Sequence, residues 1–228
     1  MSKLVIFDVD GTLARTSTVD DECWQKAALE VLGIDGISTD WGSYEHSTDE
    51  AIATELIQKY TDFFDVVGKV HEVRDRFRDL ILQAGKSEPN LFTAMPGAPT
   101  LFSCLADAGW QSAIATGGWE LTARYKLTQA GVPHEDIPAA FANDAHPRSE
   151  IIQLAQCRAE ERTGKSFDHI VYVGDGVWDV RAADQLGIGF VGCATFPRSE
   201  ELLTAGAKVV LPCFSDQELL LKALNDEC

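Results

Sequence analysis

The sequence predicts an α/β fold: a doubly wound, Rossmann-like parallel sheet with an inserted helical domain. Three observations predict it. A continuous apolar run opens the chain, strands alternate with helices after about residue 92, and the region between shows helical periodicity without a convincing strand. The length of 228 residues suits one core with a smaller insertion.

The first strand is predicted at residues 4–7, Leu-Val-Ile-Phe. This run is continuous rather than alternating and is β-branched in its centre, which is typical of a strand buried on both faces of a parallel sheet. It ends at Asp8, and Gly11 then marks a turn. Because one strand cannot stand alone, it must join the sheet that the later strands form.

The region after the first strand is predicted to be a helical module. Helical spacing marks residues 20–32, 48–60 and 65–84. In the third segment, apolar residues recur at three- and four-residue steps: Val66, Val70, Val73, Phe77, Leu80 and Ile81. We therefore predict a core built from residues 1–15 and 92–228 and a helical insertion at residues 16–91.

Strand and helix alternate in the C-terminal part. Strands are predicted at residues 113–115, 139–142, 170–173, 188–191 and 209–211. Helices are predicted near 98–108, 119–130, 149–163, 178–186 and 216–225. Such alternation implies right-handed crossovers, which place the strands in one parallel sheet with helices on both faces.

The chain is acidic, with 19 Lys and Arg against 36 Asp and Glu and a formal net charge of −17. Such a surface repels nucleic acid and anionic lipid, so neither is an expected partner. The cysteines form no Cys-x-x-Cys pair, and the apolar run after Lys3 is too short for a signal peptide. We expect a cytoplasmic protein with reduced thiols and no membrane span; the oligomeric state is left open.

Polar residues collect at the predicted carboxyl ends of the strands, where open parallel sheets bind ligands. They lie in residues 8–12 (Asp-Val-Asp-Gly-Thr), 116–118 (Thr-Gly-Gly), 143–144 (Asn-Asp) and 174–176 (Gly-Asp-Gly).

Four of these carboxylates suggest a metal site. Asp8 and Asp10 are two residues apart on extended backbone, so both point the same way. Together with Asp175 and Asp179 they form an acidic cleft that needs a cation, and hard oxygen ligands favour Mg²⁺.

The Thr-Gly-Gly segment suggests a phosphate site. Thr116, Gly117 and Gly118 precede a predicted helix, so a hydroxyl and backbone N–H groups can face an anion there. A phosphoryl dianion also needs a basic residue, for which Arg148 is well placed and His146 is the alternative.

These groups predict a two-step reaction. Asp8 attacks phosphorus and forms an acyl phosphate, while Asp10 protonates the leaving alkoxide and later deprotonates the attacking water. The metal, Thr116, the glycine amides and Arg148 hold the equatorial oxygens. Each segment alone is also typical of a turn or a helix cap, so the prediction depends on their joint appearance at successive strand ends.

The segments resemble the haloacid dehalogenase superfamily, in its phosphatase branch with phosphoglycolate phosphatase and β-phosphoglucomutase, over nearly the whole chain. Residues 8–12 look like the first family motif, which implies Asp8 as nucleophile and Asp10 as acid/base, and Thr116 matches the second. Asp175 and Asp179 match the fourth, which with Asp8 and the backbone carbonyl of Asp10 binds Mg²⁺ in the family. The helical insertion looks like the family's small cap domain, which closes over the substrate.

The third motif departs from the family pattern. It usually carries Lys, often followed by Pro, whereas residues 144–151 read Asp-Ala-His-Pro-Arg-Ser-Glu-Ile. Arg148 is the predicted substitute, and a register with His146 in this position is the alternative.

Hydrolysis of a small phosphorylated metabolite is the leading functional hypothesis; phosphoryl transfer, as in sugar phosphomutases, and a non-catalytic binding module are the alternatives. The mutase relatives carry a basic residue in the cap loop, but residues 41–47 contain no Lys or Arg. In this loop Trp41, Tyr44 and His46 could contact the leaving group as the cap closes, or they could simply pack within the cap.

Overall fold

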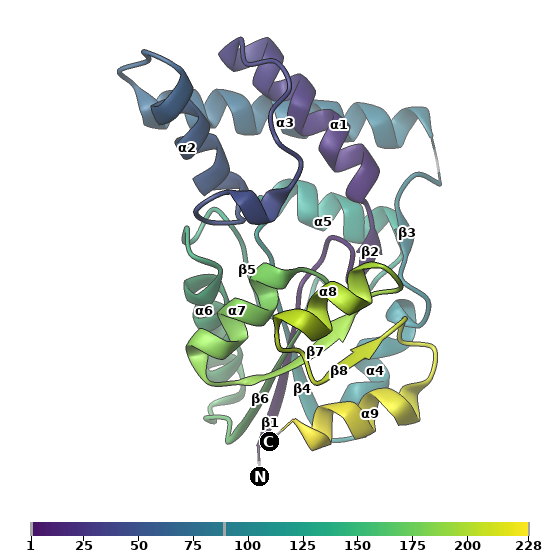
Figure 1. Ribbon diagram of the computed structural model, residues 1–228. Coiled ribbons are helices and arrows are strands. Elements are labelled where there is room, and N and C mark those ends of the chain that lie inside the picture. Colours follow the sequence, from purple (N-terminus) through teal and green to yellow (C-terminus); the bar gives the residue numbers. More distant parts are fainter. Residues whose placement is uncertain (1, 89, 228) are drawn as a thin grey trace.

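The protein folds as a parallel sheet flanked by helices, with an inserted group of helices, here named the cap, beyond the carboxyl ends of the strands (Figure 1). The computed structural model describes residues 2–88 and 90–227. The sheet has six strands in the order β5-β4-β1-β6-β7-β8, and every pair is parallel. The strands are β1 (Lys3–Phe7), β4 (Trp110–Ala115), β5 (Ala139–Ala140), β6 (His169–Gly174), β7 (Gly189–Cys193) and β8 (Val209–Leu211). The predicted fold class is confirmed.

Strand β1 lies at the centre of the sheet and is covered on both faces. Val5 and Phe7 pack into one apolar layer, whereas Leu4 and Ile6 pack into the other, because successive side chains of a strand point to opposite faces. The first layer holds α4 (Ala98–Asp107), α5 (Glu120–Gln129) and α9 (Gln217–Asp226). The second holds α6 (Arg148–Thr163), α7 (Val177–Leu186) and α8 (Arg198–Ala205).

The cap is helical, as its periodicity predicts. α1 (Ser17–Ala27) runs into a π-helical turn (Ala28–Leu32), a 3₁₀ turn covers Trp41–Ser43, and α2 (Asp49–Tyr60) and α3 (Val66–Ser87) complete the cap. The apolar stripe of α3 is buried except for the half-buried Val66.

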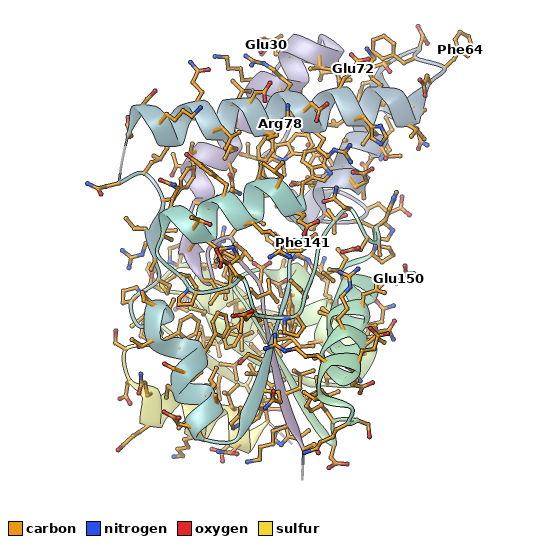
Figure 2. The ribbon with its side chains drawn as sticks, turned by 180° about the vertical axis from the view of Figure 1, so that it is seen from behind. Glu30, Phe64, Glu72, Arg78, Phe141 and Glu150 are labelled. Atoms are coloured by element: carbon orange, nitrogen blue, oxygen red, sulfur yellow. The ribbon has the colours of Figure 1, made fainter. Side chains whose placement is uncertain are left out.

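Cap and core share a packed surface. Trp119, which precedes α5 of the core, belongs to the same apolar cluster as Trp24 and Phe77 of the cap. Figure 2 shows the molecule from behind, with α3 lying above α5 and in contact with it at the junction of the two parts. Because α5 begins next to the predicted phosphate loop, this packing brings the cap over the strand ends.

A short antiparallel ribbon connects the two parts. β2 (Ala14–Arg15) pairs with β3 (Thr93–Ala94) where the chain leaves the core and where it returns. The proposed division into residues 1–15 and 92–228 for the core and 16–91 for the cap falls beside this ribbon.

Three local features differ from the sequence-based expectation. The ribbon and α8 have no counterpart among the predicted elements, since β2 and β3 are two residues each and α8 buries only Leu202. The strand predicted at 139–142 is too long, because β5 covers only Ala139–Ala140, although the next two residues stay buried. The other predicted elements are present with ends shifted by a few residues.

Across the described residues, no helix combines the length and apolar character that a membrane crossing requires. The five described cysteines are free thiols.

Candidate active site

The candidate active site lies at the carboxyl edge of the sheet, around Asp8. β1 lies between β4 and β6, with Phe7 paired to Ile114 on one side and to Val173 on the other. The residues that follow these three strands therefore meet at one place. Asp8, Thr116 and Asp175 are all buried there.

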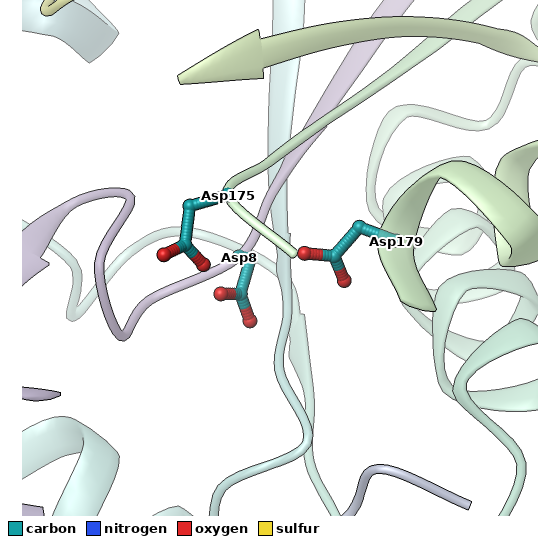
Figure 3. Close-up of side chains that lie close together, drawn as sticks. All are labelled: Asp8, Asp175 and Asp179. Carbon is teal, nitrogen blue, oxygen red and sulfur yellow. The ribbon is translucent and has the colours of Figure 1, made fainter. Parts of the chain in front are cut away.

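Three carboxylates face one another at this edge. Asp8, Asp175 and Asp179 each offer one carboxylate oxygen, and these oxygens lie within 4.8 Å of each other (Figure 3). Asp179, in the first turn of α7, is fixed by the N–H of Gly176 at 3.0 Å and the hydroxyl of Tyr172 at 3.2 Å. Arg198, at the start of α8, forms an ion pair with Asp175.

Burial perturbs the protonation of this cluster. Desolvation, opposed by Arg148, raises the pKa of Asp8 to about 7. Burial likewise raises the pKa of Asp175 to about 7 and that of Asp179 to about 6. Three buried carboxylates that repel one another are a donor set of hard oxygens for a divalent cation, so the residues present fit Mg²⁺.

The turn after Asp8 needs a glycine. Gly11 has φ +78°, in the left-handed region, and a Cβ on it would lie 2.2 Å from the Oδ2 atom of Asp175. Glycine is thus required both by the backbone conformation and by the close approach of a cluster carboxylate.

The Asp10 side chain is turned away from the carboxylate cluster. Its Oδ1 atom accepts hydrogen bonds from the Thr16 hydroxyl at 2.6 Å and from Lys126 Nζ at 2.8 Å. Among the described residues, the set of three carboxylates does not include Asp10, although Asp10 and Asp8 line one pocket. A contribution of Asp10 to metal binding would therefore have to come from its backbone carbonyl, as the family resemblance implies.

Arg148 occupies the basic position beside the cluster. It is the first residue of α6; its Nη1 atom donates to Asp8 Oδ1 at 2.9 Å, and its Nε atom lies 3.6 Å from Asp179 Oδ1. The His146 side chain is exposed and does not line the pocket. The structure thus brings Arg148, and not His146, to the nucleophile candidate.

The Thr-Gly-Gly segment lines the same pocket as Asp8 and Arg148. The Thr116 hydroxyl accepts from the N–H of Gly118 at 3.2 Å and also bonds to Asp8. A Cβ on Gly117 would lie 2.6 Å from Arg148 Nη2, so only glycine lets the guanidinium approach this closely. By contrast, Asn143 and Asp144 are engaged outside the site, by the N–H of Glu120 and by the Arg158 guanidinium.

The sequence reasoning missed a buried lysine. Lys126 of α5 is 2% exposed, and its Nζ atom lies 2.8 Å from Asp10 Oδ1 and 2.6 Å from Asp20 Oδ2. Asp20 belongs to α1 of the cap, so this ammonium joins core and cap. The sequence offered one signal, the spacing of Lys126 three and four residues after Ala123 and Thr122, on the face of α5 that the structure buries.

A pocket opens above these groups and reaches into the cap. Of the three loop residues singled out in the sequence, Trp41 lines this pocket and Tyr44 and His46 do not. Tyr44 stacks on Trp41 with ring centroids 6.1 Å apart, and its hydroxyl donates to the carbonyl of Ser38 at 2.9 Å.

The cap is docked on the core through the start of α2. The carbonyl of Ser47 accepts from Arg148 Nη2 at 2.9 Å, and the Thr48 hydroxyl donates to the carbonyl of His146 at 2.8 Å. The N–H of Asp49 donates to the carbonyl of Gly117 at 2.7 Å. Arg148 therefore contacts both the nucleophile candidate and the cap.

Comparisons with known proteins identify the family and the fold. The family model of haloacid dehalogenase-like hydrolases matches residues 2–187. A search of the curated proteins found no match.

Solved structures share the fold at low sequence identity. A hydrolase from Pseudomonas syringae has 21% identity and a TM-score of 0.72, with 97% of this chain and 98% of that chain covered. CbbY from Rhodobacter sphaeroides, solved in complex with phosphate, has 23% identity, a TM-score of 0.70 and coverage of 99% and 100%. The β-phosphoglucomutase from Clostridium difficile has 18% identity, a TM-score of 0.72 and coverage of 99% and 98%. The resemblance predicted from the sequence is confirmed, and the chain belongs to the haloacid dehalogenase-like hydrolase family.

Proposed function

We propose that this protein hydrolyses a small phosphomonoester in a Mg²⁺-dependent reaction with Asp8 as the nucleophile. One observation carries the proposal. The buried Asp8 carboxylate belongs to the three-carboxylate cluster and also accepts a 2.9 Å hydrogen bond from Arg148, at the floor of the pocket. A phosphoryl group placed there would meet a nucleophile, a cation site and fixed donors together.

The metal would be held by Asp8, Asp175 and Asp179, with the Asp10 carbonyl as the further ligand that the family resemblance implies. When bound, Mg²⁺ supplies charge neutralisation for the carboxylates and for the phosphoryl oxygens. Arg198 holds Asp175 in place from its outer side.

In the first step, an Asp8 carboxylate oxygen forms a bond to phosphorus and the ester P–O bond breaks. Arg148 and the Thr116 hydroxyl, with the N–H groups at Gly117 and Gly118, bind the equatorial oxygens and stabilise their developing charge. Asp10 gives the leaving alkoxide oxygen the proton that it shares with Asp20, a neighbouring carboxyl whose pKa burial raises well above its ordinary value.

In the second step, water attacks the phosphorus of the aspartyl phosphate. Asp10, now a carboxylate, takes a proton from this water, the P–O bond to Asp8 breaks, and inorganic phosphate leaves. Lys126 and Thr16 bond to Asp10 and keep it on the leaving-group side of the pocket. The docked cap limits access of other water to the intermediate.

Phosphoryl transfer to a second substrate is the other candidate, because β-phosphoglucomutase shares the fold. A mutase substrate carries a second phosphate, which needs cations of its own. Among the described residues, the pocket has Lys126 and Arg148 as its Lys and Arg side chains, and both already pair with aspartates. This favours hydrolysis of a monophosphate.

The test is phosphate release from a panel of phosphomonoesters, with Mg²⁺ and with excess chelator. Metal-dependent release by the wild type, reduced to below about 1% in Asp8→Asn, is the expected result because the substitution is nearly isosteric. Asp107→Asn, at an exposed carboxylate at the end of α4, is the control and should keep full activity. Equal release with and without Mg²⁺, or an active Asp8→Asn variant, would contradict the proposal.

A further inference from the structure

The half of the pocket that faces the leaving group is lined by aromatic rings. Trp24 and Phe77 come from α1 and α3, Trp41 from the 3₁₀ turn of the cap, and Trp178 from α7 of the core. The ring centroid of Trp24 lies 5.6 Å from that of Phe77 and 6.1 Å from that of Trp41. The indole N–H groups of Trp24 and Trp41 already donate to carboxylates, so neither is free for a substrate.

The same half of the pocket carries an excess of negative charge. Even with one proton on the hydrogen-bonded pair of Asp10 and Asp20, as the first step of the reaction requires, two negative charges face a single ammonium, that of Lys126, because Asp49 lines the same half. Lys126 Nζ is within hydrogen-bond distance of Asp10 and Asp20, which leaves Asp49 without an ion pair among the residues that the structure describes. Arg148 lies on the other side, against Asp8.

Asp49 accepts its hydrogen bonds from neutral donors, although the charge of Lys126 also acts on it without an ion-pair contact. Its Oδ1 atom accepts from Trp24 Nε1 at 2.9 Å, and its Oδ2 atom accepts from the N–H of Trp119 at 2.9 Å. Each carboxylate oxygen has a second lone pair, so the group can still accept from a ligand. The hydrogen bonds orient the carboxylate but do not cancel its charge.

The position of Asp49 is next to the departing group. A Cβ on Gly118 would lie 3.8 Å from Asp49 Oδ2, 3.3 Å from Asp10 Oδ2 and 3.7 Å from Thr116 Oγ1. The Asp49 carboxylate is thus close to the proposed proton donor and to the phosphate loop. A leaving group released beside Asp10 would extend past Asp49 into the aromatic half of the pocket.

These features select the charge of the leaving group. A second phosphate or a carboxylate would be repelled by Asp49, and a neutral group would leave Asp49 without an ion-pair partner. A small ammonium group neutralises Asp49 and is attracted to the surrounding ring faces. We infer that the substrate is the phosphate ester of a small amino alcohol, with its primary or quaternary ammonium bound by Asp49, Trp24 and Trp41. The inference rests on the proposed phosphatase function.

Asp49 also helps to dock the cap, so a test must separate docking from charge recognition. Docking affects every substrate alike, whereas charge recognition changes the ratio between a cationic substrate and its neutral isostere. The neighbouring Glu50 supplies the matched control, since its Oε2 atom accepts from Trp119 Nε1 at 2.6 Å but Glu50 does not line the pocket.

The experiment compares kcat/KM with Mg²⁺ for phosphocholine, phosphoethanolamine, the neutral phosphocholine isostere 3,3-dimethylbutyl phosphate, and the anionic phosphoglycolate. We expect phosphocholine or phosphoethanolamine to exceed the neutral ester by roughly ten-fold or more, with phosphoglycolate the poorest. In Asp49→Asn the ratio of cationic to neutral ester should fall to about one, and in Glu50→Gln it should be kept. A preference for the neutral or anionic ester, or an unchanged ratio in Asp49→Asn, would overturn the inference.

Binding separates this inference from the proposed function. The same four compounds are titrated into the Mg²⁺-loaded Asp8→Asn protein and followed by the fluorescence of the pocket tryptophans. Tighter binding of the cationic esters without turnover by the wild type would support the charge recognition and reject the hydrolase proposal. Turnover by the wild type, with equal or weaker binding of the cationic esters, would reject the charge recognition alone.

Discussion

Lowering the pH from 8 to 6 should weaken Mg²⁺ binding to the cluster of Asp8, Asp175 and Asp179. A metal binds the deprotonated carboxylates, so protons compete with it wherever the pKa values lie near the working pH. Burial raises the pKa of Asp8 and Asp175 to about 7 and that of Asp179 to about 6. At pH 8 almost no competing proton remains on the metal-free cluster, whereas at pH 6 most of these sites are occupied.

The size of the effect follows from these values. With one competing proton on each of the three carboxylates, the apparent Kd for Mg²⁺ rises about 200-fold from pH 8 to pH 6. If Asp8 and Asp175 share a single proton, the increase is about 20-fold. Carboxylates with their ordinary pKa would change the Kd by only a few per cent over the same range.

Isothermal titration of the metal-free protein with Mg²⁺ at pH 8, 7 and 6 measures the effect. Repeating the pH 6 titration in two buffers of different ionisation enthalpy gives the number of protons released, which should be between one and three. Asp107→Asn should behave as the wild type. A Kd that changes by less than about three-fold, with no proton release at pH 6, would refute the reasoning.

Three substitutions test other parts of the site. Gly11→Ala should destabilise the fold by about 1–2 kcal/mol in chemical denaturation and also abolish Mg²⁺ binding, because its Cβ would overlap a cluster carboxylate. Gly109 has a similar φ, +80°, but a Cβ added there would meet nothing within 4 Å, so Gly109→Ala should show the stability loss alone. The same Mg²⁺ affinity in both variants would count against the steric explanation. Arg148→Ala should lower kcat/KM by about 100-fold or more, whereas His146→Ala should stay within about two-fold, and the reverse result would show that His146 is the basic residue. Lys126→Met should lower the free energy of unfolding by about 3 kcal/mol or more, since it leaves two buried carboxylates without their cation; an unchanged denaturation midpoint would mean that the ammonium has little effect on stability.

The fold could be predicted because its elements carry their own signals. The continuous apolar run of β1 and the alternation after residue 92 identify the sheet, and the stripe of α3 identifies the cap helix. α8 carries no such signal, because a single buried leucine in eight residues sets no period. The ribbon of β2 and β3 could not be predicted for a similar reason, since each strand has two residues and its pairing depends on segments far apart in the chain.

The site could be predicted in part for a different reason. In a parallel sheet the carboxyl ends of neighbouring strands meet, so Asp8, Thr116 and Asp175 could be brought together from their places after strands. Lys126 could not be placed in this way, because its partners Asp10 and Asp20 are 116 and 106 residues away and the contact depends on how the cap docks.

The residues on the leaving-group side of the pocket could not be predicted from the sequence either. The loop 41–47 could be singled out as facing the substrate, but the structure turns only part of it inward and adds Trp24, Asp49 and Phe77 from other cap helices. Which face of each helix meets the core is set by packing against Trp119, a long-range contact that periodicity does not reveal.

The most direct measurement is acid quench of the wild-type protein during turnover of a phosphoester labelled in its phosphoryl group, followed by peptide mapping. Asp8 belongs to the carboxylate cluster and accepts a hydrogen bond from the Arg148 guanidinium, and an acyl phosphate on Asp8 is the predicted intermediate. Transient label on the peptide that contains Asp8, sensitive to hydroxylamine and absent in Asp8→Asn, is the predicted result. Phosphate release with no protein-bound label at any time point, or label on another residue, would contradict Asp8 as the nucleophile.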